Sequence, residues 1–217
     1  MAYTVLFVIM AIIACLLLLT ASLAASIGAV DAFSSSYYNT DDHIRSAHRY
    51  LTISAALGWS ALIVLIVILI VAVIAGGFST TEVSETLLNK SSPTTADLVA
   101  AYRGEKELSS GYTTQIIVLI ILIIVALVTF VVGILAILAA IQIGSMRAKD
   151  PKASNAYVAA IISAVVSVGG IGIMIVAIIA YVGIRAAREK QLKETEAFVA
   201  KTQQQLGVSP TELVKHQ

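Results

Sequence analysis

Four stretches of this 217-residue chain contain no Asp, Glu, Lys, Arg or His, and each is long enough to cross a lipid bilayer. A spanning helix needs about 20 consecutive apolar residues, and in lipid only a helix satisfies all of its backbone hydrogen bonds within a single segment. The sequence therefore predicts an all-α integral membrane bundle of four long transmembrane helices. The predicted spans cover residues 3–30, 51–78, 116–144 and 157–184.

Each predicted span is longer than an ordinary bilayer requires. A helix of about 28 residues is ~42 Å long, whereas the hydrocarbon core of a typical membrane is ~30 Å thick. We therefore expect these helices to tilt or to extend into the headgroup region.

Composition excludes the main alternatives to a membrane protein. The chain is 59% hydrophobic and 12% charged, whereas an average soluble domain has roughly 25% charged residues. Too few polar side chains exist to cover a soluble surface. The formal net charge of +1 provides no field that attracts nucleic acid, and we expect no nucleic-acid partner. The one cysteine, Cys15, excludes an intrachain disulfide.

The connections between the spans contain helix signals of their own. Asp41 or Asp42 is placed to cap an early start of the second helix. In the second connection, residues 79–82 form a capping box. A second start at Thr94 and Asp97 is followed by a stop signal at Gly104. These patterns predict two short interfacial helices that lie on the membrane surface between the second and third spans.

The chain divides at the end of the fourth span. Residues 1–184 are predicted to form the four-helix transmembrane domain, and residues 185–217 a helical C-terminal tail. The tail is expected to continue the fourth helix to Leu206 and to stop at Gly207. A last short helix is predicted to start at residues 209–212. One seam for a partner helix is suggested by the seven-residue spacing of Leu192, Val199 and Leu206.

Small residues recur every four positions within the spans, which indicates close contact between helices. The predicted helix-packing residues are Ala21, Ala25, Gly133, Ala136, Ala140, Gly144, Ala160, Ala164 and Gly170. The bulky stretches 62–71 and 116–125 are expected to face lipid or partner chains. The glycines at 169–172 admit a second interpretation, a broken helix that forms a binding site at mid-membrane. Close helix contact is the interpretation we favour.

The sequence contains no recognisable catalytic, cofactor-binding or metal-binding motif. We therefore predict no enzymatic activity, no cofactor and no metal. Asp41, Asp42, His43 and His48 do not have the spacing of a zinc site. The two histidines are expected to lie at the level of the lipid headgroups.

Basic residues follow the fourth span and bias the orientation of the chain. The predicted membrane-interface residues, which would anchor this helix end at anionic headgroups, are Arg185, Arg188, Lys190 and Lys193. The N-terminus, the second connection and the tail together hold nine Lys and Arg, whereas the opposite side holds five. The positive-inside bias therefore places both termini on the cytoplasmic side. Use of the glycosylation acceptor at Asn89 would invert this orientation.

The second span opens with Ala47-His48-Arg49-Tyr50-Leu51, a basic and aromatic pattern directly before a long apolar run. This opening, with the four-span layout, resembles the small internal-membrane proteins of large DNA viruses. Those proteins are built-in components of a virion's lipid layer beneath a protein capsid. The resemblance implies a structural role and no catalytic residues. Tetraspan families with disulfides in their loops are excluded by the lone cysteine.

We expect a non-enzymatic structural protein that anchors or tethers a membrane within a larger assembly. Its partners would be the lipid bilayer and other proteins, which the second connection and the tail would contact, and a homo-oligomer is an alternative. A second hypothesis is a small channel or transport subunit, with Thr129, Ser163 and Ser167 lining the axis of a homo-oligomer. A third is an accessory subunit of a membrane complex, although the spans lack histidines that could bind haem or chlorophyll.

Overall fold

Four long helices make up most of the described part of the chain. The computed structural model describes residues 2–75, 85–88 and 92–211. The helices are α1 (Ala2–Phe33), α2 (Asp42–Ile74), α4 (Thr95–Ile143) and α5 (Pro151–Leu206), with a single short turn of helix, α3 (Glu85–Leu88). Each of the four long helices is long and apolar enough to cross a membrane. The predicted all-α, four-span fold class is confirmed.

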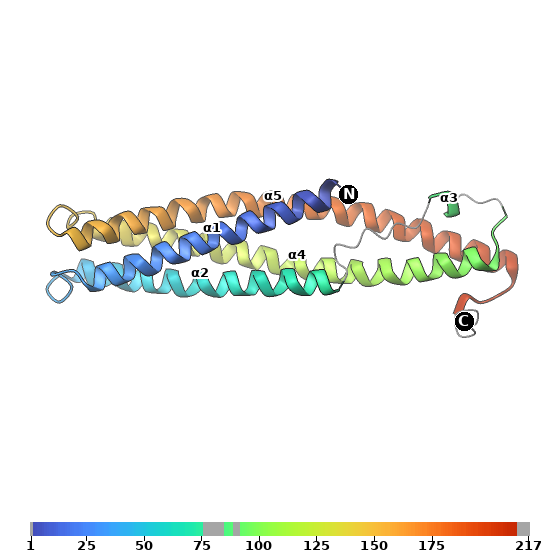
Figure 1. Cartoon of the computed structure of the whole chain (residues 1–217), viewed down its shortest axis with the longest axis horizontal. Helices are drawn as coiled ribbons and strands as arrows, with labels where there is room; N and C mark the ends of the chain where they lie inside the picture. The colour runs from blue at the N-terminus through green and yellow to red at the C-terminus, as the bar shows by residue number, and fades with distance from the viewer. Residues whose placement is uncertain (1, 76–84, 89–91, 212–217) are drawn as a thin grey trace.

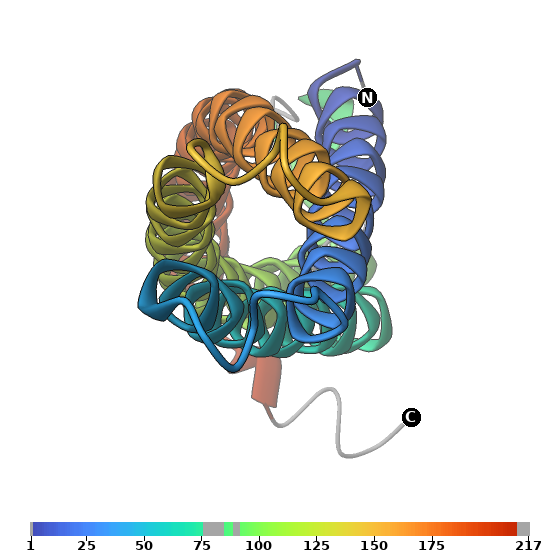
Figure 2. The same ribbon diagram turned by 90° about the vertical axis from the view of Figure 1, so that its left-hand side faces the viewer.

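The four long helices pack side by side as one up-and-down bundle (Figure 1). Seen end-on, they follow one another around the bundle in chain order, and α5 closes the ring against α1 (Figure 2). The loops at 34–41 and 144–150 lie together at one end, which we call the loop end. The start of α1 and the end of α2 lie at the other end, from which α4 and α5 extend further. We call this the stalk end.

The buried residues of every long helix recur at intervals of seven. α1 buries Phe7, Ala14, Ala21 and Gly28, and α2 buries Ile44, Leu51, Gly58, Leu65 and Ala72. α4 buries Ala101, Leu108, Gln115, Leu122, Thr129, Ala136 and Ile143. α5 buries Ala153, Ala160, Ser167, Met174, Tyr181, Thr195 and Thr202, and Arg188, the member of this series between Tyr181 and Thr195, is partly buried. A seven-residue repeat keeps one seam of each helix on the inside of a left-handed bundle. Buried positions therefore repeat every seven residues along each helix. The four-residue spacing of small residues is one of the two steps, of three and four residues, that make up this repeat.

The core changes character from one end of the bundle to the other. Near the loop end it consists mostly of alanine, including Ala25, Ala29, Ala47, Ala139, Ala153, Ala156 and Ala160. Towards the stalk end it is filled by large side chains, including Phe7, Leu18, Leu65, Leu122, Met174 and Tyr181. Small side chains allow close contact between helix backbones in a membrane, so the two halves of the bundle are held together in different ways.

Three glycines mark the closest approaches between helices. A Cβ atom added to Gly28 would lie 3.1 Å from the Cβ of Ala159, and one added to Gly133 would lie 3.2 Å from the Cβ of Ser167. A Cβ atom on Gly58 would overlap the hydroxyl of Ser22. Gly28 and Gly58 were not among the predicted packing residues, although Gly28 lies four residues from both Ala24 and Ala32. Their place in the seven-residue series is the signal that would have found them.

All of the predicted packing residues are buried except Gly144. Gly144 is partly exposed and forms the C-cap of α4, where the chain leaves the helix. Of the neighbouring glycines in α5, Gly170 faces Thr129, whereas an added Cβ at Gly169 or Gly172 would meet nothing within 4 Å. α5 is continuous through all three glycines. The alternative of a broken fourth helix is therefore wrong.

The bulky stretches of α2 and α4 contribute to the core as well as to the outer surface. Leu62, Leu65 and Ile68 are buried in α2, and Val118 and Leu122 are buried in α4. The expectation that these stretches face only lipid or partner chains is therefore wrong on one side of each helix. The reason is the seven-residue seam, which runs through these stretches without interruption.

The residues that the sequence predicted to cap the helix ends do so in the structure. The side chain of Asp41 accepts a hydrogen bond from the backbone N–H of His43 at 2.8 Å and caps α2. Thr94 and Asp97 form the predicted capping box of α4. α5 ends at Leu206, and Gly207 adopts the left-handed conformation at φ 66° that favours glycine at a helix end.

Of the two short helices predicted between the second and third spans, the second does not form a separate helix, whereas α3 lies within the first. α4 does not stop at Gly104 but runs unbroken from Thr95 to Ile143. Gly104 is buried there, and its backbone does not adopt the positive φ of a helix stop. A glycine inside a helix costs about 1 kcal/mol relative to alanine, and packing against α5 opposes this cost. Only the turn α3 represents a separate short helix.

Several expectations lie outside the described residues. They concern the capping box at 79–82, the end of the second span at 76–78 and the glycosylation acceptor at Asn89. The predicted last helix is described only at Pro210 and Thr211.

Candidate interaction sites at the two ends of the bundle

Two helices continue beyond the bundle as an antiparallel pair (Figure 1). We call this pair the stalk and assign to it residues 95–115 of α4 and 185–206 of α5. About 21 residues at 1.5 Å each give a stalk ~30 Å long. Neither helix is interrupted where the charge-free span ends. The stalk is therefore a straight extension of two transmembrane helices: α5 continues to Leu206 as the sequence predicted, and α4 replaces the second predicted interfacial helix.

The stalk has a hydrophobic core of its own near its tip. Leu98 and Ala101 of α4 are buried against Phe198 and Val199 of α5. Further apolar side chains packed on this core are Leu87, Leu88, Tyr102 and Leu206. Val199 and Leu206 belong to the seam that the sequence suggested for a partner helix. The structure shows that they pack within the chain instead.

Charged residues cover the outside of the stalk, and several of them are paired. Lys193 lies 3.0 Å from Glu189, and Lys190 lies 3.8 Å from Glu194. These are exposed pairs one helical turn apart, and each stabilises the helix by only about 0.3–0.5 kcal/mol. Burial raises the pKa of the Glu105 carboxyl, and the neighbouring Glu196 carboxylate raises it further.

The base of the stalk lies where the apolar spans end. Arg185 donates a hydrogen bond to the hydroxyl of Tyr112 at 3.2 Å, and its guanidinium lies 5.4 Å from the centre of the same ring. Arg188 is partly buried one turn further along α5. Of the predicted membrane-interface residues, Arg185 and Arg188 thus lie directly beyond the apolar surface. Lys190 and Lys193 stand about 9 and 14 Å further out than Ile184 along the helix axis.

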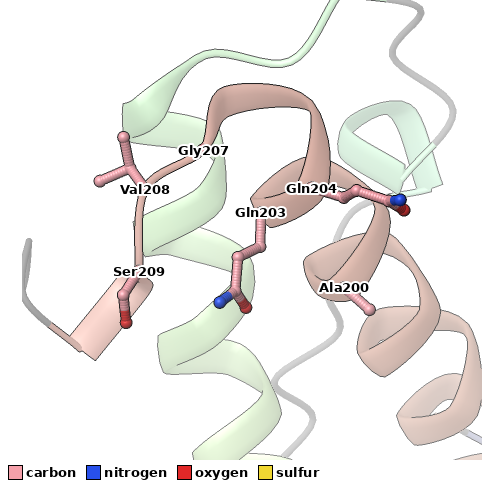
Figure 3. Close-up of a pocket in the computed structure, with 6 residues that line it drawn as sticks. All are labelled: Ala200, Gln203, Gln204, Gly207, Val208 and Ser209. Atoms are coloured by element: carbon pink, nitrogen blue, oxygen red, sulfur yellow. The ribbon is translucent and has the colours of Figure 1, made fainter.

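An open depression lies at the tip of the stalk (Figure 3). It has a volume of about 540 Å³ and is formed where the chain turns away from α5 after its last helical turn. Its lining residues are Ala200, Gln203, Gln204, Gly207, Val208 and Ser209. None of these side chains is an acid, a base or a strong nucleophile, so the depression offers hydrogen bonds and no catalytic group.

At the loop end, the Asp150 carboxylate joins the two loops. Asp150 is only 8% exposed. Its Oδ2 accepts hydrogen bonds from the Ser35 hydroxyl at 2.5 Å and from the Ser36 backbone N–H at 3.1 Å. Its Oδ1 accepts one from the Lys152 backbone N–H at 3.0 Å and caps α5. The Ser35 hydrogen bond is the largest cause of a lowered pKa for Asp150, and the backbone N–H groups of Lys152 and Ser36 lower it further.

Other cross-links surround this carboxylate. Lys152 forms an ion pair with Asp31 at 2.9 Å, which joins α5 to α1. His43 shares a hydrogen bond with the side chain of Gln142, which joins α2 to α4. His48 contacts the backbone carbonyl of Ala29 at 2.9 Å. The histidines therefore connect helices at this end, and neither belongs to a group of metal-binding side chains among the described residues.

Hydroxyl side chains at mid-membrane face the inside of the single chain. Thr129, Ser163 and Ser167 are at most 1% exposed. Ser54 of α2 donates a hydrogen bond to the backbone carbonyl of Val132 in α4 at 3.2 Å, which links two neighbouring helices. Because these residues lie within one bundle, they do not line an axis between copies of the chain.

Comparison with known proteins provides no relative from which a role could be transferred. No family model, no curated protein and no solved structure matches the chain.

Proposed function

We propose that this chain is a non-enzymatic membrane anchor that holds a partner protein at a set height above a bilayer. The observation that supports this role is the unbroken passage of α4 and α5 from the membrane into the stalk. A force applied to the stalk tip is transmitted into the bundle, because no flexible joint lies between them. A partner bound near the tip would be held ~30 Å from the end of the apolar surface.

The loop end fits the same role. An anchor must resist pulling without losing the packing of its helices. The Asp150 cluster and the Lys152–Asp31 ion pair tie α1 and α5 together at the end opposite the stalk. The alanine-rich core beside them brings the helices into close contact.

The resemblance to internal-membrane proteins of large DNA viruses suggests one setting for such an anchor. There the partner would be a capsid or scaffold protein, and the stalk would separate it from the virion's inner membrane. The stalk and both termini would then lie on the cytoplasmic-equivalent side, which the positive-inside bias favours.

The channel hypothesis receives less support. It requires Thr129, Ser163 and Ser167 at the axis of a homo-oligomer, yet their side chains are enclosed within one chain. The outer faces available to a second copy are instead covered by Ile and Val. The hypothesis of an accessory subunit has no specific observation in its favour.

The proposal is tested by purifying the full chain from its native source in gentle detergent, with cross-linking mass spectrometry. A partner present in stoichiometric amount, cross-linked to Lys106, Lys193 or Lys201 of the stalk, is the expected result. A homo-oligomer without partners that conducts ions in a planar bilayer would overturn it in favour of the channel. An intrinsic enzymatic turnover would also overturn it.

A change in stalk length tests the set height directly. Deleting residues 102–108 together with residues 190–196 removes one heptad from each helix at matching levels. The stalk should shorten by ~10 Å without a change in its seven-residue register. In electron micrographs of the assembly, the gap between membrane and partner should narrow by the same amount. An unchanged gap would show that the stalk does not set it.

A further inference from the structure

The lipid-facing surface is tall on α1, α4 and α5, whereas the exposed large apolar residues described on α2 extend from Ile53 to Ile74, or ~32 Å. On α4, large apolar side chains are exposed from Ile117 (53%) to Ile141 (67%). On α5, the same holds from Val158 (51%) to Val182 (47%). Both pairs are about 24 residues apart, which corresponds to ~36 Å along the helix. α1 agrees, because exposed apolar residues extend over about 25 residues from Val5 to Val30, or ~37 Å.

Polar and aromatic groups mark both edges of this apolar band. At the loop end, the guanidinium of Arg147 lies 4.8 Å from the centre of the Tyr157 ring. At the stalk end, Arg185 is held on Tyr112. Tyrosine and arginine prefer the boundary between hydrocarbon and headgroups. The two pairs therefore indicate where the lipid headgroups lie, on either side of the band.

The band exceeds the thickness of an ordinary membrane. The hydrocarbon core is ~30 Å thick on average, ~27 Å in the endoplasmic reticulum and ~32–33 Å in sterol-rich plasma membranes. A typical helix tilt of ~20° shortens a 36 Å band to only ~34 Å, and a fit to ~30 Å needs ~34° of tilt. The helices are packed as one body, so the whole bundle and its stalk would have to lean together.

Such a tilt is opposed by the polar groups at the edges. If the whole bundle tilts away from the membrane normal, one side of its loop end moves into the hydrocarbon core. The other side moves out of the headgroup region into water. Arg147 and Arg185 lie on opposite ends of the bundle and both carry a charge that is expensive to immerse. No proline kinks either helix, because α4 contains none and the proline of α5 is at its first position.

We propose that the lipid partner of this bundle is a thick bilayer, with a hydrocarbon core of ~34–36 Å formed by long acyl chains or by sterol-rich lipid. The apolar band fits such a membrane without tilt beyond the usual ~20°, and the stalk then stands upright on it. The inference does not depend on the role proposed for the stalk.

Trp59, the single tryptophan, provides the measurement. The full chain is reconstituted in phosphatidylcholines that differ only in acyl-chain length, with hydrocarbon cores from ~24 to ~38 Å. Quenching of Trp59 fluorescence by brominated lipids of each length gives relative lipid affinities. We expect an affinity maximum near ~35 Å, about threefold above the value at ~28 Å. A maximum at or below ~30 Å, or a profile without a maximum, would overturn the proposal.

A pair of variants tests whether the band height sets the maximum. Replacing Ile117→Gln and Val182→Gln lowers the stalk-side edge by one turn on two helices, so the maximum should move to bilayers thinner by a few ångströms. The matched control, Thr113→Gln with Ala186→Gln, places the same side chains on exposed positions just outside the band. The control should keep the wild-type maximum. If the band variant does not fold, the wild-type profile alone still decides.

Discussion

α4 and α5 run through both the bundle and the stalk, but their packing differs between the two regions. In the bundle, α4 and α5 each have two helical neighbours, and small residues such as Ala136, Ala160 and Gly170 allow close contact. In the stalk they have only each other, and larger side chains such as Leu98 and Phe198 fill the seam. The seven-residue register is common to both regions.

The outer surfaces differ because the solvent changes. In the bundle, exposed positions of α4 and α5 hold Ile and Val, since lipid imposes no penalty on apolar surface. In the stalk, the exposed large apolar residues disappear and paired Lys and Glu replace them. The seven-residue spacing of buried positions determines how the helices pack in both regions. The surroundings, lipid or water, determine which residue types occupy the exposed positions.

The largest expected change in stability is confined to the stalk and leaves the bundle folded. Phe198→Ala should destabilise the stalk by about 3 kcal/mol, because it removes the largest side chain of a small two-helix core. The stalk should then open locally while the bundle stays folded. Hydrogen exchange measured by mass spectrometry should show lost protection at 95–115 and 185–206 alone. Ala197→Gln, at the exposed neighbouring position, is the control; loss of protection throughout the bundle would show that the two regions are not separable.

The next effect is confined to the bundle. Gly28→Val should destabilise it by about 2–3 kcal/mol, because the added side chain meets Ala159 and Leu51 at 3.1 and 3.2 Å. The matched change Gly172→Val, on the lipid-exposed face, should stay within about 0.5 kcal/mol of the wild type. Unfolding in sodium dodecyl sulfate, followed by Trp59 fluorescence, gives both values. Equal losses for the two variants would contradict the close approach at Gly28.

Asp150 tests the loop end. Asp150→Asn should destabilise the bundle by about 2 kcal/mol, because it weakens charge-assisted hydrogen bonds from Ser35 and Ser36 of the other loop and from the backbone N–H of Lys152. Since the folded-state pKa is lowered, this stabilisation is complete above the unfolded pKa of about 3.9 and is lost as the pH falls through the lower folded value. The same unfolding assay from pH 6 to pH 2.5 measures it. Asp42→Asn, at an exposed position, should leave the acid sensitivity unchanged.

The smallest effect has the opposite sign and lies in the stalk. Burial and Glu196 raise the pKa of Glu105, so its contribution to folding is complete below about pH 4.5 and is lost as the pH rises through the folded value. Stalk amides, corrected for intrinsic exchange rates, should be better protected at pH 4.5 than at pH 7. Glu105→Gln should abolish this difference. A wild-type stalk with equal protection at both pH values would refute the coupling.

The sequence predicted the elements that depend on local chemistry. The four spans, the caps at Asp41 and Thr94 and the stop at Gly207 each follow from a few neighbouring residues. The helix stop predicted at Gly104 was wrong, because it also relied on neighbouring residues alone. In the structure α4 continues through Gly104, where it packs in the stalk. The sequence also predicted basic residues at the membrane interface, and the straight continuation of α5 places Lys190 and Lys193 about 9 and 14 Å beyond Ile184 along the helix axis.

The candidate sites were less predictable because they join distant parts of the chain. Ser35 and Asp150 are 115 positions apart, and nothing in either loop sequence indicates the other. The membrane class followed from sequence alone, because lipid forces each charge-free segment to satisfy its own backbone. The extension of α4 and its pairing with α5 in the stalk, the loop-end cluster and the inward-facing hydroxyls were decided only in the tertiary structure, because which face of a helix is buried depends on the helices beside it.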